Sequence, residues 1–136
     1  MVKKAKSKSK PKVKKPKVRR YDLSRIALAA AKAMQVPGAF TQRGLSFDID
    51  GRPAGVFKPE AVKCDALGWI LKEAYRILAL EGKKTQPAYW ASELINEEVL
   101  ARIGRSLVAI SDEDGRKAVI WVLIDIGVDF KRPESF

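Results

Sequence analysis

The side chains that usually carry out chemistry at neutral pH are scarce in this sequence. The chain of 136 residues has no histidine, which excludes histidine-based acid–base catalysis, Ser-His-Asp triads and histidine-ligated zinc. Its one cysteine, Cys64, excludes thiolate clusters and an internal disulfide, so a reducing compartment is expected. No Walker or GxGxxG phosphate loop occurs. The sequence therefore predicts a protein that is not an enzyme and uses no cofactor.

Cys64 is the candidate nucleophile. It stands just before a predicted helix start, where the helix dipole could lower the pKa of its thiol. The alternative is a buried thiol beside Ala61 and Gly68, since free cysteine often behaves as a small core residue. We prefer the buried thiol and expect slow reaction with thiol reagents.

Two acidic strings could hold a cation, but local structure explains both. Residues 48–51 (DIDG) resemble part of a calcium loop, yet Phe57 stands where the bidentate glutamate belongs, so a turn is preferred. Residues 111–114 (SDED) are interpreted as a capping box, with Ser111 as N-cap and Asp114 reaching back. Three consecutive acids cannot all converge on one ion, and no metal site is predicted.

Positive charge at the N-terminus is the strongest chemical signal. Residues 1–20 hold nine lysines, two arginines and no acid, so they carry the whole net charge of +11, and residues 21–136 are neutral. Few apolar residues and two prolines predict disorder when this tail is free. Such an arm binds phosphates without reading bases, because each neutralised phosphate releases a counterion. The candidate nucleic-acid-binding residues are Lys3, Lys4, Lys6, Lys8, Lys10, Lys12, Lys14, Lys15, Lys17, Arg19 and Arg20.

Other interpretations of the tail stay open. Its Lys-Ala-Pro-Val composition resembles that of linker-histone tails, and residues 14–17 (KKPK) fit a nuclear-import pattern that has meaning only in a eukaryotic cell. Anionic lipid is a third possible partner, although no acylation site or apolar face accompanies the charge. A solubilising or cloning-derived segment is the alternative without function.

The predicted fold is mainly α, with four to five helices and one short β-hairpin. The first helix spans 21–35, with Asp22 as cap, and ends at residues 37–38 (PG). Helical spacing predicts that its inner face contains Leu23, Ile26, Ala27, Ala30, Ala31 and Met34. Residues 59–82 form the strongest helical segment, in which Pro59 suits a first turn, Asp65 caps a longer helix and Gly82 ends it. Its inner face is predicted to contain Leu67, Ile70, Leu71, Ala74 and Leu78.

The second half of the chain is predicted to be helical too. A run that starts at Pro87 continues to Ile110, and Asn96 could cap a second helix within it. Residues 118–126 (AVIWVLIDI) are apolar on all sides and are interpreted as a buried helix rather than a strand. The hairpin is placed at about 45–57, around the turn signal at residues 50–51 (DG).

Three aromatic residues lie off the main apolar stripes. Trp69, Tyr75 and Tyr89 could stack on bases or dock a partner. Aromatic side chains in such positions more often widen a core face, and we prefer that interpretation.

Several short motifs follow one another along the chain, namely 38–40 (GAF), 48–53 (DIDGRP), 61–64 (AVKC), 66–68 (ALG), 111–112 (SD) and 115–116 (GR). Their order resembles a small, uncharacterised family of bacterial and phage-encoded domains of unknown function. The resemblance covers about residues 25–127, and residues 37–47 depart from the family's tryptophan-containing pattern. It implies a compact, mainly helical fold with a small hairpin and implies no activity.

The expected organisation is a basic tail (1–20), a helical domain (21–130) and a polar end (131–136). We expect a non-enzymatic, nucleic-acid-associated protein that binds DNA or RNA through the tail. The alternative is a phage- or bacterium-encoded protein-interaction module whose tail gives avidity or solubility. No apolar run reaches membrane-spanning length and no secretory signal is evident. A cytoplasmic location is therefore expected, and association with a nucleoid or a place within a virion would also fit.

Overall fold

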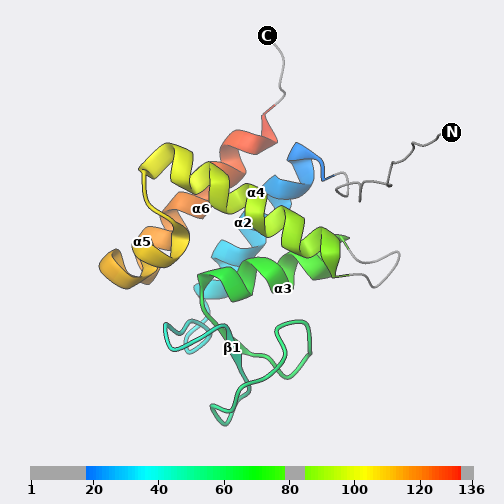
Figure 1. Cartoon of the computed structure of the whole chain (residues 1–136), viewed down its shortest axis with the longest axis vertical. Helices are drawn as coiled ribbons and strands as arrows, with labels where there is room; N and C mark the ends of the chain where they lie inside the picture. Colours follow the sequence, from blue (N-terminus) through cyan, green and yellow to red (C-terminus); the bar gives the residue numbers. More distant parts are fainter. Residues whose placement is uncertain (1–17, 79–84, 133–136) are drawn as a thin grey trace, which may run out of the picture.

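The computed structural model describes residues 18–78 and 85–132, and it confirms the predicted mainly helical fold. The described helices are α2 (Arg20–Met34), α3 (Ala66–Leu78), α4 (Gln86–Ile103), α5 (Leu107–Asp114) and α6 (Arg116–Lys131). Strands β1 (Ser46–Phe47) and β2 (Lys63–Cys64) form one antiparallel sheet. Figure 1 shows this sheet and its loops on one side of the helices, below α3. The predicted disorder of the tail concerns residues outside the described ones.

Helices α2 and α6 form the central pair of the core and run antiparallel. The Arg20 guanidinium lies 4.4 Å from the centre of the Phe130 ring, and the Ser24 hydroxyl donates to the Gly127 carbonyl (2.6 Å). A Cβ at Gly127 would lie only 2.4 Å from Cγ of Leu28. The missing side chain therefore lets the two helices approach closely. The inner face of α2 is buried as predicted, with Leu23, Ile26, Ala27, Ala30, Ala31 and Met34 in the core.

The predicted cap of α2 is wrong. The helix begins earlier, so Arg19 is at the N-cap position and makes no side-chain cap bond. Asp22 lies in the first turn, where its buried carboxylate pairs with Arg19 (3.2 Å) and Arg25 (3.8 Å). A negative charge there also interacts favourably with the helix dipole. The C-terminal end is as predicted, with Gly38 in a left-handed conformation.

Helix α3 begins where Asp65 was predicted to cap it. The N–H of Gly68 donates to Asp65 Oδ1 (2.7 Å). Pro59, however, lies in turns rather than in a helix, because residues 61–65 are extended and pair with β1 and its neighbours. Of the predicted apolar stripe, Ile70, Leu71 and Ala74 are buried. Leu67 and Leu78 are only partly buried, and Gly82 lies outside the described residues.

Asn96 does not divide α4, which is continuous and ends at Gly104 in a left-handed conformation. Instead, Oδ1 of Asn96 accepts a hydrogen bond from the N–H of Leu107 (3.1 Å), and so a residue of α4 caps the N-terminus of α5. The N-cap of α5 is Ser106, whose Oγ accepts from the N–H three residues on. The predicted capping box is therefore wrong. Ser111 is buried within α5, and the acids that follow it end that helix instead of starting the next.

Residues 118–126 are helical as predicted, but they are not buried on all sides. One stripe, formed by Val119, Leu123, Ile126 and Phe130, belongs to the core. Trp121 on the outer side is 67% exposed, and Val128 is exposed too. The other helices cover only one side of α6, so apolar residues such as Trp121 and Val128 remain on its outer face.

The small sheet is built from segments farther apart than predicted. Asp48 Oδ1 accepts from the N–H groups of residues 50 and 52, and Gly51 has a positive φ of 84°, which confirms the predicted turn. Within the predicted hairpin, however, Phe47 makes only an isolated bridge to Pro53. The strand paired with β1 is β2, in a register that places Phe47 opposite Lys63.

Candidate functional site

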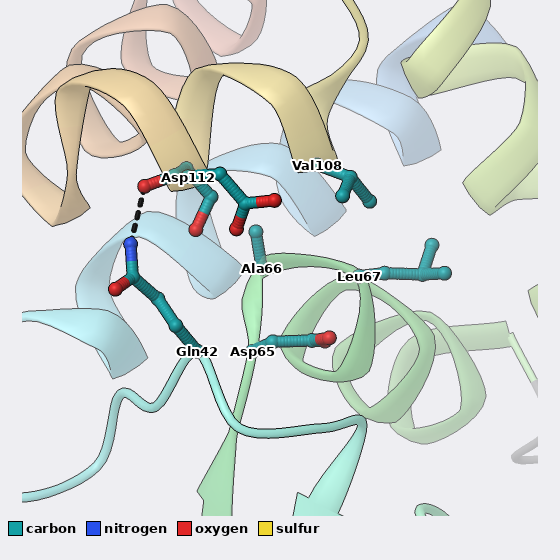
Figure 2. A pocket seen from close by; sticks show the side chains of 7 residues that line it. Gln42, Asp65, Ala66, Leu67, Val108 and Asp112 are labelled. Atoms are coloured by element: carbon teal, nitrogen blue, oxygen red, sulfur yellow. Dashed lines mark hydrogen bonds between the residues drawn. The ribbon is translucent and has the colours of Figure 1, made fainter.

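A small pocket lies between the start of α3 and α5 (Figure 2). It has a volume of about 140 Å³ and is lined by Gln42, Asp65, Ala66, Leu67, Val108, Ser111 and Asp112. Figure 2 shows the Gln42 side chain crossing from its loop to α5, where Nε2 donates to the Ser111 carbonyl. This bond connects the loop after α2 to α5.

Two carboxylates give the pocket a negative character. The pKa of Asp65 is raised, first by burial and also by the neighbouring charge of Asp112. The N–H groups of Gly68 and Leu67 stabilise the carboxylate and partly oppose that rise. The Asp65 carboxylate therefore serves as a helix cap at some electrostatic cost.

The pocket is smaller than the usual binding site for a small organic ligand. Sites for small organic ligands have volumes of roughly 300–1,000 Å³. Among residues 18–78 and 85–132, no three cysteine or acidic residues come together in a way that could hold a metal ion. Asp65 already accepts a backbone hydrogen bond, and Gln42 is held by α5. We interpret this pocket as a structural junction.

Cys64 lies in the core, as the preferred interpretation of the sequence expected. Its side chain is completely buried, and burial raises the pKa of the thiol to about 11. Its backbone joins β2 to residues 39–41, because its N–H donates to the Ala39 carbonyl (2.9 Å) and its carbonyl accepts from the N–H of Thr41 (3.1 Å). A protonated, enclosed thiol is a poor nucleophile at neutral pH.

The three aromatic residues singled out in the sequence mostly widen the core. Trp69 is buried, and its Nε1 donates to the Ala39 carbonyl (2.8 Å). The half-buried ring of Tyr75 lies 4.8 Å from that of Phe57. Tyr89 is 49% exposed and meets Phe57 edge-on, at 5.7 Å between ring centres. The preferred interpretation therefore holds for Trp69 and Tyr75, and Tyr89 is only partly covered.

Sequence reasoning missed a groove between the end of α2 and the outer face of α6. It has a volume of about 480 Å³ and is lined by Gln35, Arg116, Lys117, Ile120, Trp121 and Ile124. Arg116 and Lys117 are exposed and form no ion pair among the described residues. The sequence did contain one indication of this groove: residues 117, 121 and 124 are spaced so that they lie on one face of a helix. We call this feature the α6 groove.

The structure places only the last two of the predicted nucleic-acid-binding residues. Arg19 pairs with Asp22, and Arg20 lies over the Phe130 ring. Val18 packs against the core, so ordered contacts begin before the predicted domain boundary at residue 21. The nine lysines lie outside the described residues. The tail therefore joins the domain beside the C-terminal end of α6.

Comparison with known protein families, with curated proteins and with solved structures finds no match for this chain. The resemblance to an uncharacterised bacterial and phage family stays a prediction. Within the described ranges, no helix is both long and apolar enough to cross a membrane.

Proposed function

We propose that this chain is a non-enzymatic, nucleic-acid-associated protein whose basic tail binds the phosphate backbone of DNA or RNA without sequence specificity. The observation that carries the proposal is the position of the charge. All +11 of the net charge lies in residues 1–20, ahead of a neutral domain. This proposal includes a cytoplasmic location. It would also fit association with a nucleoid or a place within a virion.

Ion pairing within the domain supports the tail as the main phosphate-binding element. Arg102 bridges Glu98 of α4 and Asp129 of α6. Arg105 pairs with two acids at the end of α5, at 2.7 and 2.8 Å. Arginines held in this way are already neutralised, and so is Arg19 beside Asp22, whereas no acid stands among the nine tail lysines in the sequence. A polyanion would therefore meet its highest density of unneutralised charge at the tail.

A salt titration of DNA binding tests the proposal. If about six tail charges contact phosphates at once, affinity should fall about a thousandfold between roughly 50 and 200 mM salt. In the double variant Lys10→Gln/Lys12→Gln, the slope of log affinity against log salt should decrease by about 1 for duplex DNA, because about half of the tail charges are in contact at any time. The matched control is Lys58→Gln/Lys131→Gln, which removes the same charge from exposed positions in the domain.

The control should keep the slope of the original protein. Equal slopes for the two double variants would place the phosphate contacts outside the tail and would overturn the proposal. Scrambling the DNA sequence should leave affinity unchanged, because phosphate contacts carry no base information.

A second candidate function is a protein-interaction module, encoded by a phage or a bacterium. It is favoured by three exposed apolar side chains at the corner between α4 and α5, namely Leu100, Ile103 and Val108. Exposed apolar residues that gather in one region mark interaction surfaces. Light scattering of the full chain and of Val108→Glu tests whether this corner mediates self-association. If both proteins are monomeric, this corner does not mediate self-association, and the interaction module would need a different protein as its partner.

A further inference from the structure

We propose that the α6 groove binds single-stranded nucleic acid, with Trp121 stacking on a base while Arg116 and Lys117 contact phosphates. This inference deepens the proposed function and rests on it. It adds a binding site within the domain to the contacts of the tail.

The exposure of Trp121 is the first observation. Its side chain is 67% exposed although an indole ring is among the largest apolar groups in proteins. Ile120 and Ile124 line the groove beside it and are themselves half-buried. An aromatic face of this kind next to an apolar floor can hold a flat ring, and base stacking on aromatic side chains tolerates any base sequence.

The charge of the residues that line the α6 groove indicates which kind of flat ring it would bind. The groove is lined by two cations and no acid, and its remaining polar residue is the neutral Gln35. Neither cation has an ion-pair partner among the described residues, in contrast to Arg102 and Arg105. The next acid along α6, Asp125, lines a different groove together with Arg102. A polyanion with flat bases therefore complements the α6 groove, and the lysine-rich tail of the chain itself does not.

The geometry favours a single strand over a duplex. In a duplex the base faces are stacked on one another and are not available to an indole on a helix surface. An unpaired strand can turn a base onto Trp121 and keep its phosphates beside the cations. Duplex DNA should therefore bind through the tail alone.

The tail and the groove can act on one strand. The tail joins the domain where Arg20 lies over Phe130, nine residues along α6 from Trp121. At a rise of 1.5 Å per residue, this corresponds to about 14 Å. The seventeen residues that precede Val18 in the sequence could span at most about 60 Å. Binding of both elements to one strand would then raise affinity through effective concentration.

Fluorescence anisotropy with a labelled homothymidine strand of about 20 nucleotides tests the inference on the full chain, because this strand is unpaired and is longer than the roughly 4–16 nucleotides that a single OB fold covers. Trp121→Ala should weaken single-strand binding about tenfold, since stacking contributes roughly 1–3 kcal/mol per base. Trp121→Phe should recover most of the affinity, and Trp121→Leu should not. Binding of a duplex of the same length should be unchanged in all three variants.

A second lysine on α6 provides a matched control for the contact assigned to Lys117. Lys117→Gln should lower the salt slope for the single strand by about 0.7, because one phosphate contact is lost. Lys131→Gln removes an exposed lysine that does not line the groove, and any effect should be smaller. Equal slopes in these two variants would overturn the assignment of a phosphate contact to Lys117.

The outcomes separate this inference from the proposed function. If Trp121→Ala binds the single strand normally while replacing the nine tail lysines by glutamine abolishes binding, the groove site is wrong and the tail proposal stands. If Trp121→Leu binds as well as the original protein, the contact is apolar rather than stacking, and the inference is wrong. If the full chain binds neither strand type, both proposals fail. Circular dichroism of each variant checks that the fold is kept.

Discussion

Gly68 gives the sharpest test of how α3 is joined to the rest of the domain. A Cβ at this position would lie 2.2 Å from the carbonyl oxygen of Leu45 and 2.9 Å from Cβ of Cys64. The Leu45 carbonyl is a backbone group that also accepts from the N–H of Asp65 (3.2 Å), so it cannot move away without loss. We therefore expect Gly68→Ala to be destabilising, although alanine is ordinarily the better helix former.

The magnitude follows from three contributions. Overpacking costs about 1–3 kcal/mol. Displacing the Leu45 carbonyl weakens its hydrogen bond with Asp65, which contributes about 1 kcal/mol. The higher helix propensity of alanine returns at most about 1 kcal/mol. The expected net loss is about 2 kcal/mol, which corresponds to a melting temperature lower by about 8 °C for a domain of this size.

Thermal unfolding followed by circular dichroism measures this loss. Gly55→Ala is the matched control, because a Cβ there would meet only the flexible side chain of Lys58, at 3.1 Å. That variant should melt within about 2 °C of the original protein, since a permitted Gly→Ala change in a loop is close to neutral or slightly stabilising. If both variants melt alike, the close approach of α3 to the Leu45 carbonyl does not hold in solution.

Three further predictions concern single groups. Cys64 should react with an aromatic disulfide reagent at neutral pH only after denaturation, because its thiol is buried and its pKa is about 11; fast reaction of the native protein would contradict this. Asp112→Asn should lower the raised pKa of Asp65, as followed by NMR of the carboxyl carbon. A raised carboxyl pKa means that stability is lost as pH rises from the ordinary value of 3.8 through the raised one, so this loss should shrink in the variant. Ser24→Ala should cost about 1 kcal/mol in urea unfolding, because it removes the buried hydrogen bond to Gly127; no change would show that the bond contributes nothing.

Local patterns predicted the helices well. The face of α2 that the spacing of apolar residues marked is the face that is buried. The Asp65 cap and the turn at Asp48–Gly51 were also predicted correctly, because each is made by residues within four positions of one another. Interactions of this range can be encoded in the local sequence itself. The caps predicted at Asp22 and Ser111 were wrong, because these residues lie inside helices that begin earlier.

The candidate site was harder to predict. Nothing in the run 118–126 distinguishes Val119, which is completely buried, from Trp121, which is 67% exposed. That difference depends on which side of α6 the other helices cover. The α6 groove was missed for this reason, whereas Trp69 was correctly interpreted as a core residue.

The sequence by itself determined the helical character of the chain, the lack of histidine and the separation of a +11 tail from a neutral remainder. These properties depend on composition and on short-range periodicity. The tertiary structure alone decided that Asn96 caps α5, that β1 pairs with residues 63–64, and that the outer face of α6 stays open. Each of these depends on contacts between segments distant in sequence, and the packing of the whole chain determines which segments meet.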